Sequence, residues 1–176
     1  QASFAARRYA EAEQKYKDVL RIDSTTPGAL AYLAAAQMEL NRPEDAEANL
    51  RKAIAEEPDH PFSLAMLGYL ALVREKYQNA FEFLSHAAQV DPKNPNVQNN
   101  LGITLSKLGQ RGPAEIAFRK ALQMYPDFED AHFNLAAIYA HQQPPFLELA
   151  RFHYNKAIVG GHAKDPNLEK ILNPAP

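Results

Sequence analysis

Apolar and small residues recur along this chain with the spacing of amphipathic helices. One run of helical spacing comprises Leu30, Leu33, Ala34 and Gln37, and the next comprises Ala46, Leu50, Ala53 and Ile54. The segment Asn41-Arg42-Pro43 between them consists of residues that favour turns. The pattern therefore predicts two helices joined by a short turn.

The same pattern returns every 34 residues, and the chemistry of each position returns with it. A leucine is followed by alanine or glycine at Leu33-Ala34, Leu67-Gly68, Leu101-Gly102 and Leu135-Ala136. An alanine column comprises Ala12, Ala46, Ala80 and Ala114, and a large apolar column comprises Tyr16, Leu50, Leu84 and Phe118. Only small side chains let two helices cross closely, so the small columns mark helix crossings. A plain helical bundle has no reason to repeat its chemistry at a fixed interval, so the period excludes it.

The period divides the chain into structural units. The predicted units are a half repeat at 1–26, full repeats at 27–60, 61–94 and 95–128, a repeat with a two-residue insertion at 129–164, and a capping helix with a tail at 165–176. Thr26 and Asn94 each precede a proline and are predicted N-caps, because their side chains can accept from the first free N–H groups. Pro58, Pro92 and Pro126 end the second helix of each full repeat, since proline cannot continue a helix.

These columns resemble the tetratricopeptide repeat. The best match is 95–128, with Leu101-Gly102, Leu105, Ala114, Phe118, Ala121 and Pro126 at the family's positions. The family's first aromatic residue is missing, and Leu30, Leu64, Gln98 and His132 stand in its place. The resemblance implies an all-α, right-handed superhelical solenoid of antiparallel helix pairs, with about 4.5 repeats and a short C-terminal capping helix.

The two edges of the array depart from the pattern. Residues 1–26 supply only the tail of a first helix and one complete second helix, with Phe4, Tyr9 and Tyr16 unsupported. We therefore expect a fragment of a longer chain with further repeats upstream, or self-association through the open N-terminal repeat end. Near the other end, the insertion lies at 141–145, and the segment 165–172 is predicted to cover the last repeat with Leu168, Ile171 and Leu172. The final residues 173–176 are expected to be loose.

Composition narrows the classes of function. Hydrophobic residues make up 46% of the chain and charged residues 23%, as in an ordinary folded protein. The net charge of −2 gives no overall field to attract nucleic acid, so we expect no nucleic-acid partner. No segment has the apolar length of a membrane helix, so no direct membrane insertion is expected. The chain has no cysteine, which fits a cytoplasmic, periplasmic or exported protein equally.

No catalytic constellation is visible, so the sequence predicts no enzyme, no cofactor and no metal. Glu129 and His132 have the spacing of metal ligands, but a helical metal site needs several such pairs to converge. Ser85 and His86 are consecutive on a helix and do not face each other. The turn at 109–112 contains two glycines but lacks the pattern of a phosphate-binding loop.

The resemblance implies that the first helix of each pair lines a concave groove, which gives a set of candidate binding residues. These are Tyr32, Phe62, Met66, Tyr69, Asn96, Asn99, Asn100, Ile103, Phe133 and Asn134. The early candidates are aromatic or apolar and can anchor apolar side chains. The later ones are rich in amides, which can match the N–H and C=O groups of an extended peptide. A carboxylate clamp like that of chaperone-binding repeats is not expected, because Lys107 is the one cation in these columns and stands at the far end of its helix.

The sequence thus predicts a protein–protein interaction scaffold that binds a peptide or partner segment in its groove. The alternative is a structural or self-associating segment that packs against other domains of a longer protein, including a regulatory part of an enzyme. The identity of the partner is not encoded in any motif of the chain.

Overall fold

The computed structural model describes the backbone of residues 2–173 and the side chains of residues 5–173. Every regular element in this range is a helix. The helices are α1 (Ala2–Ile22), α2 (Pro27–Glu39), α3 (Pro43–Glu56), α4 (Pro61–Val73), α5 (Tyr77–Val90), α6 (Pro95–Lys107), α7 (Arg111–Met124), α8 (Glu129–Ala140), α9 (Leu147–Gly160) and α10 (Pro166–Leu172). They form two compact units, unit 1 (Gln1–Asp91) and unit 2 (Pro92–Pro176). Residues 174–176 of the predicted loose tail and the predicted unsupported Phe4 side chain lie outside the description.

Prolines and short polar side chains set the helix starts. The Asn94 side chain accepts a hydrogen bond from the Val97 N–H at 3.2 Å, as the sequence predicts. The prediction for Thr26 is wrong. Its hydroxyl instead donates to the Asp23 carboxylate at 3.0 Å, so it closes the loop before α2 and leaves the helix without a side-chain cap. At the start of α4, the His60 side chain accepts a hydrogen bond from the Ser63 N–H and so caps the helix. The sequence pattern did not predict this cap.

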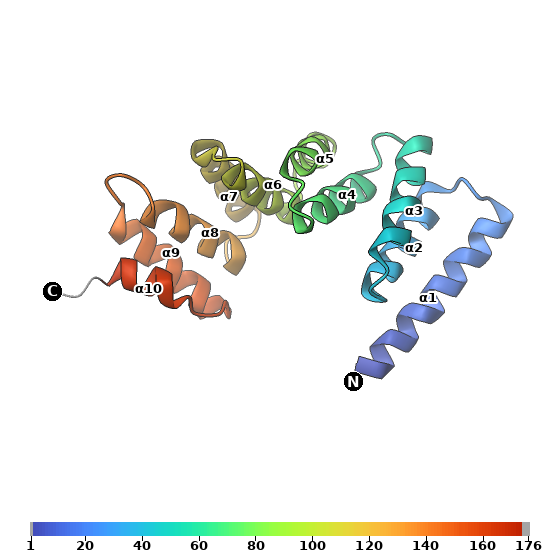
Figure 1. Cartoon of the computed structure of the whole chain (residues 1–176), viewed down its shortest axis with the longest axis horizontal. Helices are drawn as coiled ribbons and strands as arrows, with labels where there is room; N and C mark the ends of the chain where they lie inside the picture. Colours follow the sequence, from blue (N-terminus) through green and yellow to red (C-terminus); the bar gives the residue numbers. More distant parts are fainter. Residues whose placement is uncertain (1, 174–176) are drawn as a thin grey trace. The chain divides into compact units, whose positions relative to one another are not determined.

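In unit 1, α2 packs on α3 and α4 packs on α5 as neighbouring helices (Figure 1). The alanine and large apolar columns form the contact, since Ala46, Leu50 and Ala53 are fully buried. A Cβ built on Gly68 would lie 2.5 Å from Leu84 Cγ, which is closer than carbon atoms can approach. The glycine therefore lets α4 cross α5 at the distance that Leu84 sets.

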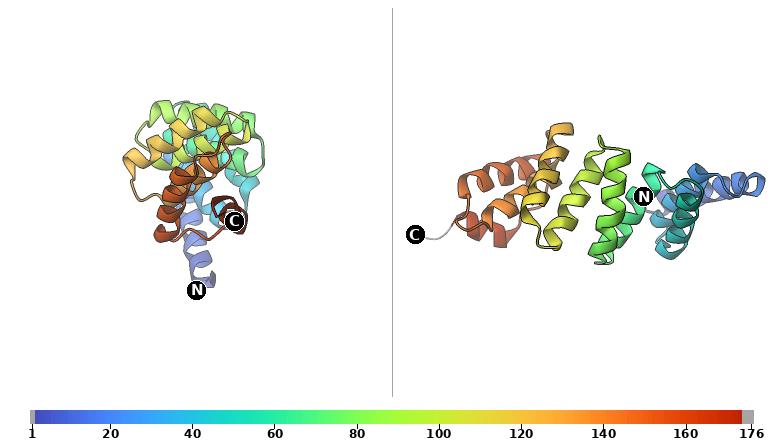
Figure 2. Two further views of the ribbon diagram at one scale, coloured as in Figure 1. Left: turned by 90° about the vertical axis from the view of Figure 1, so that its left-hand side faces the viewer. Right: turned by 90° about the horizontal axis from the view of Figure 1, so that it is seen from above.

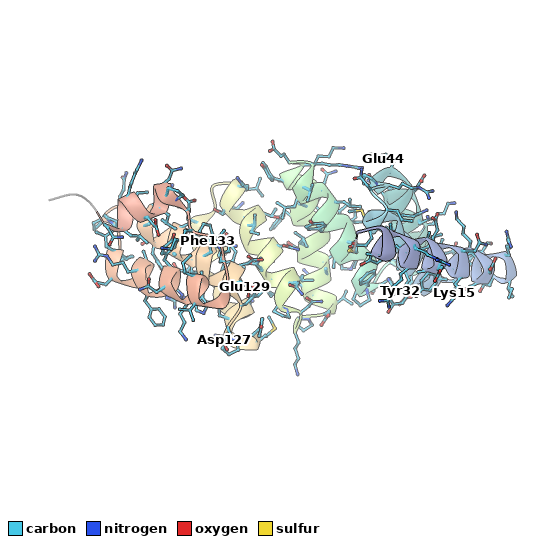
Figure 3. The ribbon with its side chains drawn as sticks, turned by 90° about the horizontal axis from the view of Figure 1, so that it is seen from below. Lys15, Tyr32, Glu44, Asp127, Glu129 and Phe133 are labelled. Carbon is cyan, nitrogen blue, oxygen red and sulfur yellow. The ribbon has the colours of Figure 1, made fainter. Side chains whose placement is uncertain are left out.

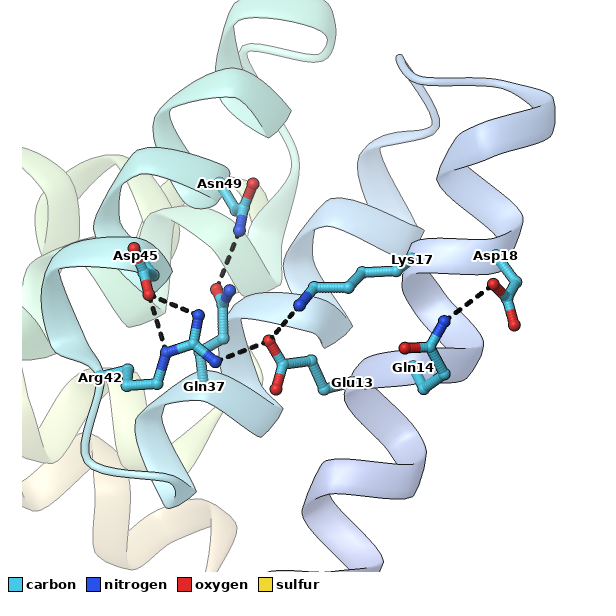
Figure 4. A network of polar contacts seen from close by, with 8 residues as sticks. All are labelled: Glu13, Gln14, Lys17, Asp18, Gln37, Arg42, Asp45 and Asn49. Carbon is cyan, nitrogen blue, oxygen red and sulfur yellow. Dashed lines mark hydrogen bonds and ion pairs between the residues drawn. The ribbon is translucent and has the colours of Figure 1, made fainter.

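A buried carboxylate joins α1 to the α2–α3 turn of unit 1. Glu13 accepts from Lys17 Nζ at 2.7 Å and from Arg42 Nη1 at 2.8 Å, and Arg42 also contacts Asp45 (Figure 4). The hydrogen bonds from Lys17 and Arg42 hold the pKa of the Glu13 carboxyl below its ordinary value of 4.5, although burial opposes them.

In unit 2, the helix pairs are α6 with α7 and α8 with α9, and α8 lies beside α9 in both views of Figure 2. Gly102 faces Phe118 in the same way that Gly68 faces Leu84. A Cβ atom on Gly102 would lie 2.6 Å from the Phe118 ring. The short helix α10 packs on α8 and α9 and buries Leu168 and Leu172, as predicted for a capping helix. Arg151 holds the C-terminal end of α10 by donating a hydrogen bond to the Leu172 carbonyl oxygen at 2.8 Å.

Candidate functional site

The surface of unit 1 carries a row of three stacked aromatic rings from three helices. Tyr32 on α2 lies between Tyr16 on α1 and Phe62 on α4, with ring centroids 5.6 Å and 5.5 Å away (Tyr32 is labelled in Figure 3). Offset or tilted packing of this kind is favourable for aromatic rings. The rings remain accessible, since Tyr32 is 53% exposed and Phe62 is 38% exposed.

These rings form one side of a groove with a volume of about 410 Å³. The groove is lined by Tyr9, Ala12, Tyr16, Tyr32, Ala35, Ala36, Met38, Glu39, Phe62 and Met66. Glu39 is the charged member of this lining. We call this surface, defined by those residues, the aromatic groove. It brings together the predicted residues Tyr32, Phe62 and Met66, whereas the exposed ring of Tyr69 lies outside its lining.

The sequence did not single out the contribution of α1 to this groove. Tyr16 belongs to the large apolar column whose other members Leu50, Leu84 and Phe118 are buried, so its column suggested a core residue. In the structure, Tyr16 is half-buried and stacks on Tyr32. Tyr16 and Tyr9 are both aromatic residues of α1. This aromatic character is the sequence signal that could have identified Tyr16 as part of the groove.

The predicted amide residues of unit 2 differ in their exposure and in their hydrogen bonds. Asn99 is only 4% exposed, and its side-chain oxygen accepts from Asn134 Nδ2 at 3.2 Å. The prediction that Asn99 lines an open groove is therefore wrong, because α6 turns this amide into the packed interior. Asn96 is exposed and Asn100 is half-buried, and within residues 5–173 no side-chain hydrogen bond joins Asn100 to Asn134.

The remaining two candidates of unit 2 have different surroundings. Phe133 is half-buried and stacks on His162, with the centroids 4.0 Å apart, so its ring packs against the segment after α9 (Figure 3). Ile103 and Asn134 line a second hollow of unit 2, which also contains Lys107 and Arg111.

Two histidines that are far apart in the sequence meet between α8 and α9. His132 Nε2 lies 2.9 Å from the Pro126 carbonyl oxygen, which can only accept, so this nitrogen carries the proton. His132 Nδ1 therefore accepts from His153 Nδ1 at 2.8 Å. Burial, followed by the charges of His132 and Arg119, lowers the pKa of His153 from 6.5 to about 4. His153 is therefore uncharged near pH 7, and its hydrogen bond to His132 joins the two helices.

The described residues contain neither a converging group of metal ligands nor a helix that could cross a membrane. Among the residues described, no three histidine, cysteine, aspartate or glutamate side chains converge as a metal site would require. Within the same range, each helix is too short or too polar to cross a bilayer.

Comparison with protein families agrees with the repeat read from the sequence. Two family models, both described as tetratricopeptide repeat, match residues 3–67 and 95–128. This chain is a tetratricopeptide-repeat protein.

Solved structures share the fold of this tetratricopeptide-repeat protein. PilF of Pseudomonas aeruginosa aligns with a TM-score of 0.77 over 97% of this chain and 82% of its own, at 20% identity. MamA of Desulfovibrio magneticus aligns with a TM-score of 0.75 over 90% of this chain and 89% of its own, also at 20% identity. These likenesses confirm the predicted all-helical repeat fold. The match to the tetratricopeptide-repeat family supports a protein–protein interaction scaffold in general terms.

Curated relatives are much longer than the tetratricopeptide-repeat chain. A TPR repeat-containing protein of Pseudomonas aeruginosa is 38% identical over 48% of this chain and 15% of its own length. Protein O-mannosyl-transferase TMTC3 of Homo sapiens is 27% identical over 85% of this chain and 17% of its own length. Cellulose synthase operon protein C of Pseudomonas fluorescens is 29% identical over 95% of this chain and 13% of its own length. The chain therefore spans less than a fifth of these relatives.

Proposed function

We propose that this chain binds a polypeptide segment, and that the aromatic groove of unit 1 is where its apolar side chains are held. The observation that carries the proposal is the row of packed rings formed by the half-buried Tyr16 and the exposed Tyr32 and Phe62, which come from three helices and line one groove. Exposed apolar surface of this kind marks interaction sites, and tyrosine contributes strongly to binding because its large ring has few rotatable bonds.

The occupant should be a segment with large apolar side chains. Met38 and Met66 line the groove beside the rings, and their flexible thioethers can adapt to side chains of different shapes. The positions of the groove residues on successive first helices are fixed by the buried columns beneath them. A partner would therefore meet a preformed surface, which reduces the entropy lost on binding.

The first test is a peptide selection followed by substitution. Peptides are selected from a random display library on the wild-type chain, and their affinities are measured for wild type and for Tyr32→Ala/Phe62→Ala. We expect the double variant to lose about tenfold or more in affinity, because two anchoring rings are removed. Ile22→Ala is the matched control in unit 1, since Ile22 is exposed and lies outside the groove, and it should bind as wild type does.

Equal affinity of the selected peptides for the wild type and the Tyr32→Ala/Phe62→Ala variant would contradict the proposal. Circular dichroism and thermal melting of both variants establish that they are folded, which the exposure of the substituted side chains favours.

Self-association is the alternative that a specific observation supports. On α1, Val19 is 44% exposed, whereas Ala53, Ala87 and Ala121 in the same column are fully buried. Val19 lines a hollow of α1 together with Ala12, Tyr16 and the charged residues Arg8, Glu11 and Lys15, and a second copy of the chain could cover this surface.

A further inference from the structure

Unit 2 has its own hollow, and its lining differs in kind from that of the aromatic groove. Its volume is about 310 Å³, which is at the small end of the range found for ligand sites. It is lined by Ile103, Ser106 and Lys107 of α6, Arg111 and Phe118 of α7, Asn134, Ala137 and Ile138 of α8, and His141 after α8. We call it the cationic pocket. Two cations line it, and no carboxylate does.

The cations of the cationic pocket are not neutralised by their neighbours. Within residues 5–173, neither Lys107 nor Arg111 forms an ion pair, and both side chains are exposed. In the described part of the chain, the Arg111 guanidinium donates to the neutral carbonyl oxygen of His141, at 2.9 Å, and so holds the start of the inserted loop against α7. The positive charge is therefore available to a ligand.

The placement of Arg111 is unfavourable for the helix that carries it. Arg111 begins α7, where the helix dipole presents its positive end, and the first turn of α7 contains no acidic residue. The first turn of α3 contains Glu44 and Asp45, and that of α9 contains Glu148, as the dipole favours, whereas the first turn of α5, like that of α7, contains no acidic residue. An anion bound in the cationic pocket would balance the charge of the two unpaired cations. It would also interact favourably with the positive end of the α7 helix dipole.

Comparison within the chain shows that the charge is particular to unit 2. The positions 68 residues earlier than Lys107, Arg111 and His141 are Glu39, Pro43 and Val73. The repeat pattern thus does not require cations here, because the same helix positions in unit 1 are acidic or apolar.

The lining of the cationic pocket also contains apolar and hydrogen-bonding side chains. Ile103 and Ala137 are half-buried apolar members of this lining, and Asn134 and Ser106 add hydrogen-bonding groups to it. An apolar lining beside two cations fits a large apolar side chain that is followed closely by a carboxylate. We propose that the cationic pocket binds an acidic polypeptide segment, with an aspartate or glutamate carboxylate on Lys107 and Arg111 and an apolar side chain on Ile103 and Ala137. This proposal rests on the proposed function, which is the binding of a polypeptide segment. It adds a second contact, in which the bound segment carries a negative charge.

The experiment uses the peptides selected on the wild-type chain and a second selection on Lys107→Glu/Arg111→Glu. The wild type should enrich aspartate or glutamate next to a large apolar residue, and the charge-reversed variant should lose that enrichment. A synthetic acidic peptide and its glutamine or asparagine counterpart are then compared by calorimetry. We expect the neutral peptide, and the acidic peptide on the variant, each to bind about tenfold or more weakly, with a difference that shrinks as salt is added.

Lys120→Glu/Lys156→Glu is the matched control, because it makes the same charge change in unit 2 at exposed residues outside the pocket. It should bind the acidic peptide within about twofold of the wild type once non-specific charge effects are screened. Lys107→Gln/Arg111→Gln provides a second variant that adds no repulsion, and it should lose affinity in the same direction. Thermal melting reports on the fold of each variant.

The outcomes separate this proposal from the proposed function. If the acidic and neutral peptides bind equally, or if Lys107→Glu/Arg111→Glu binds as the control does, the cationic pocket is not a carboxylate site. Loss of affinity in Tyr32→Ala/Phe62→Ala would then still support the aromatic groove. A phosphoserine peptide that binds about tenfold more tightly than the carboxylate peptide would overturn the carboxylate as the ligand in favour of a phosphoryl group.

Discussion

At the scale of the residue, the spacing between helices depends on the pairing of one small and one large side chain. Gly102 faces Phe118 and Gly68 faces Leu84, with no room for a Cβ in either pair. The repeat columns predicted that these positions would be small, because Ala34 and Ala136 occupy the same column. They could not show that glycine is required at two of them, since that depends on how close the facing ring or branched side chain lies.

Replacing Gly102 by alanine should lower the free energy of unfolding of the chain. The added Cβ would meet the ring of Phe118, which is 1% exposed and cannot move into solvent. Overpacking of this kind costs about 1–3 kcal/mol, and the better helix propensity of alanine offsets part of it. Chemical denaturation of the purified variant measures the change.

Gly28→Ala is the natural control, since no atom lies within 4 Å of a Cβ placed there. It should leave the stability unchanged or raise it by up to about 1 kcal/mol, because alanine reduces the entropy of the unfolded chain. A Gly102→Ala variant as stable as Gly28→Ala would show that the α6–α7 crossing relaxes freely.

At the scale of the element, helix contacts depend on polar pairs that no local motif reveals. Thr26 and Asn94 both precede a proline and were both predicted to cap a helix, yet the Thr26 side chain makes no cap bond. It also treated His132 as an isolated partly buried residue, whereas His153 meets it from α9. The two-residue insertion shifts the phase of α9 against the period, so a column alignment could not pair these histidines.

The contact between α8 and α9 should weaken in mild acid. The folded-state pKa of His153, about 4, lies below its ordinary value of 6.5, so the unfolded chain takes up a proton before the folded chain does. The stabilisation is complete above about pH 6.5 and is lost as the pH falls to about 4. The loss should be on the order of 2 kcal/mol, since each pKa unit corresponds to about 1.4 kcal/mol and partial solvent access reduces the effect.

Urea denaturation at a series of pH values measures this dependence. His153→Gln should flatten the curve between about pH 6.5 and 4, whereas His86→Gln, at a partly exposed histidine of α5, should retain it. If the two variants show the same pH dependence, the histidine pair does not control the acid stability.

At the scale of the whole molecule, the sequence predicted the fold, and it named only some of the residues that line the proposed binding surface. The period, the helix pairs and the capping helix α10 follow from apolar columns, which the core imposes directly. The proposed binding residues lie on the surface, where packing places fewer demands on the sequence. Tyr32, Phe62 and Met66 were predicted together, but the part played by Tyr16 required the structure, as did the grouping of Lys107 with Arg111. These last two come from different helices and are not neighbours in any repeat column.

The central claim is that a polypeptide binds along the aromatic groove, and the methionines of the chain offer a direct probe of it. The chain has three methionines, of which Met38 and Met66 line the groove and Met124 lies at the end of α7 in unit 2. NMR of methyl-labelled methionine therefore gives two reporters and an internal control. Addition of a selected peptide should shift the Met38 and Met66 signals, at the concentrations at which it binds, and leave Met124 unchanged. Binding without a shift at Met38 and Met66, or a shift confined to Met124, would contradict the account.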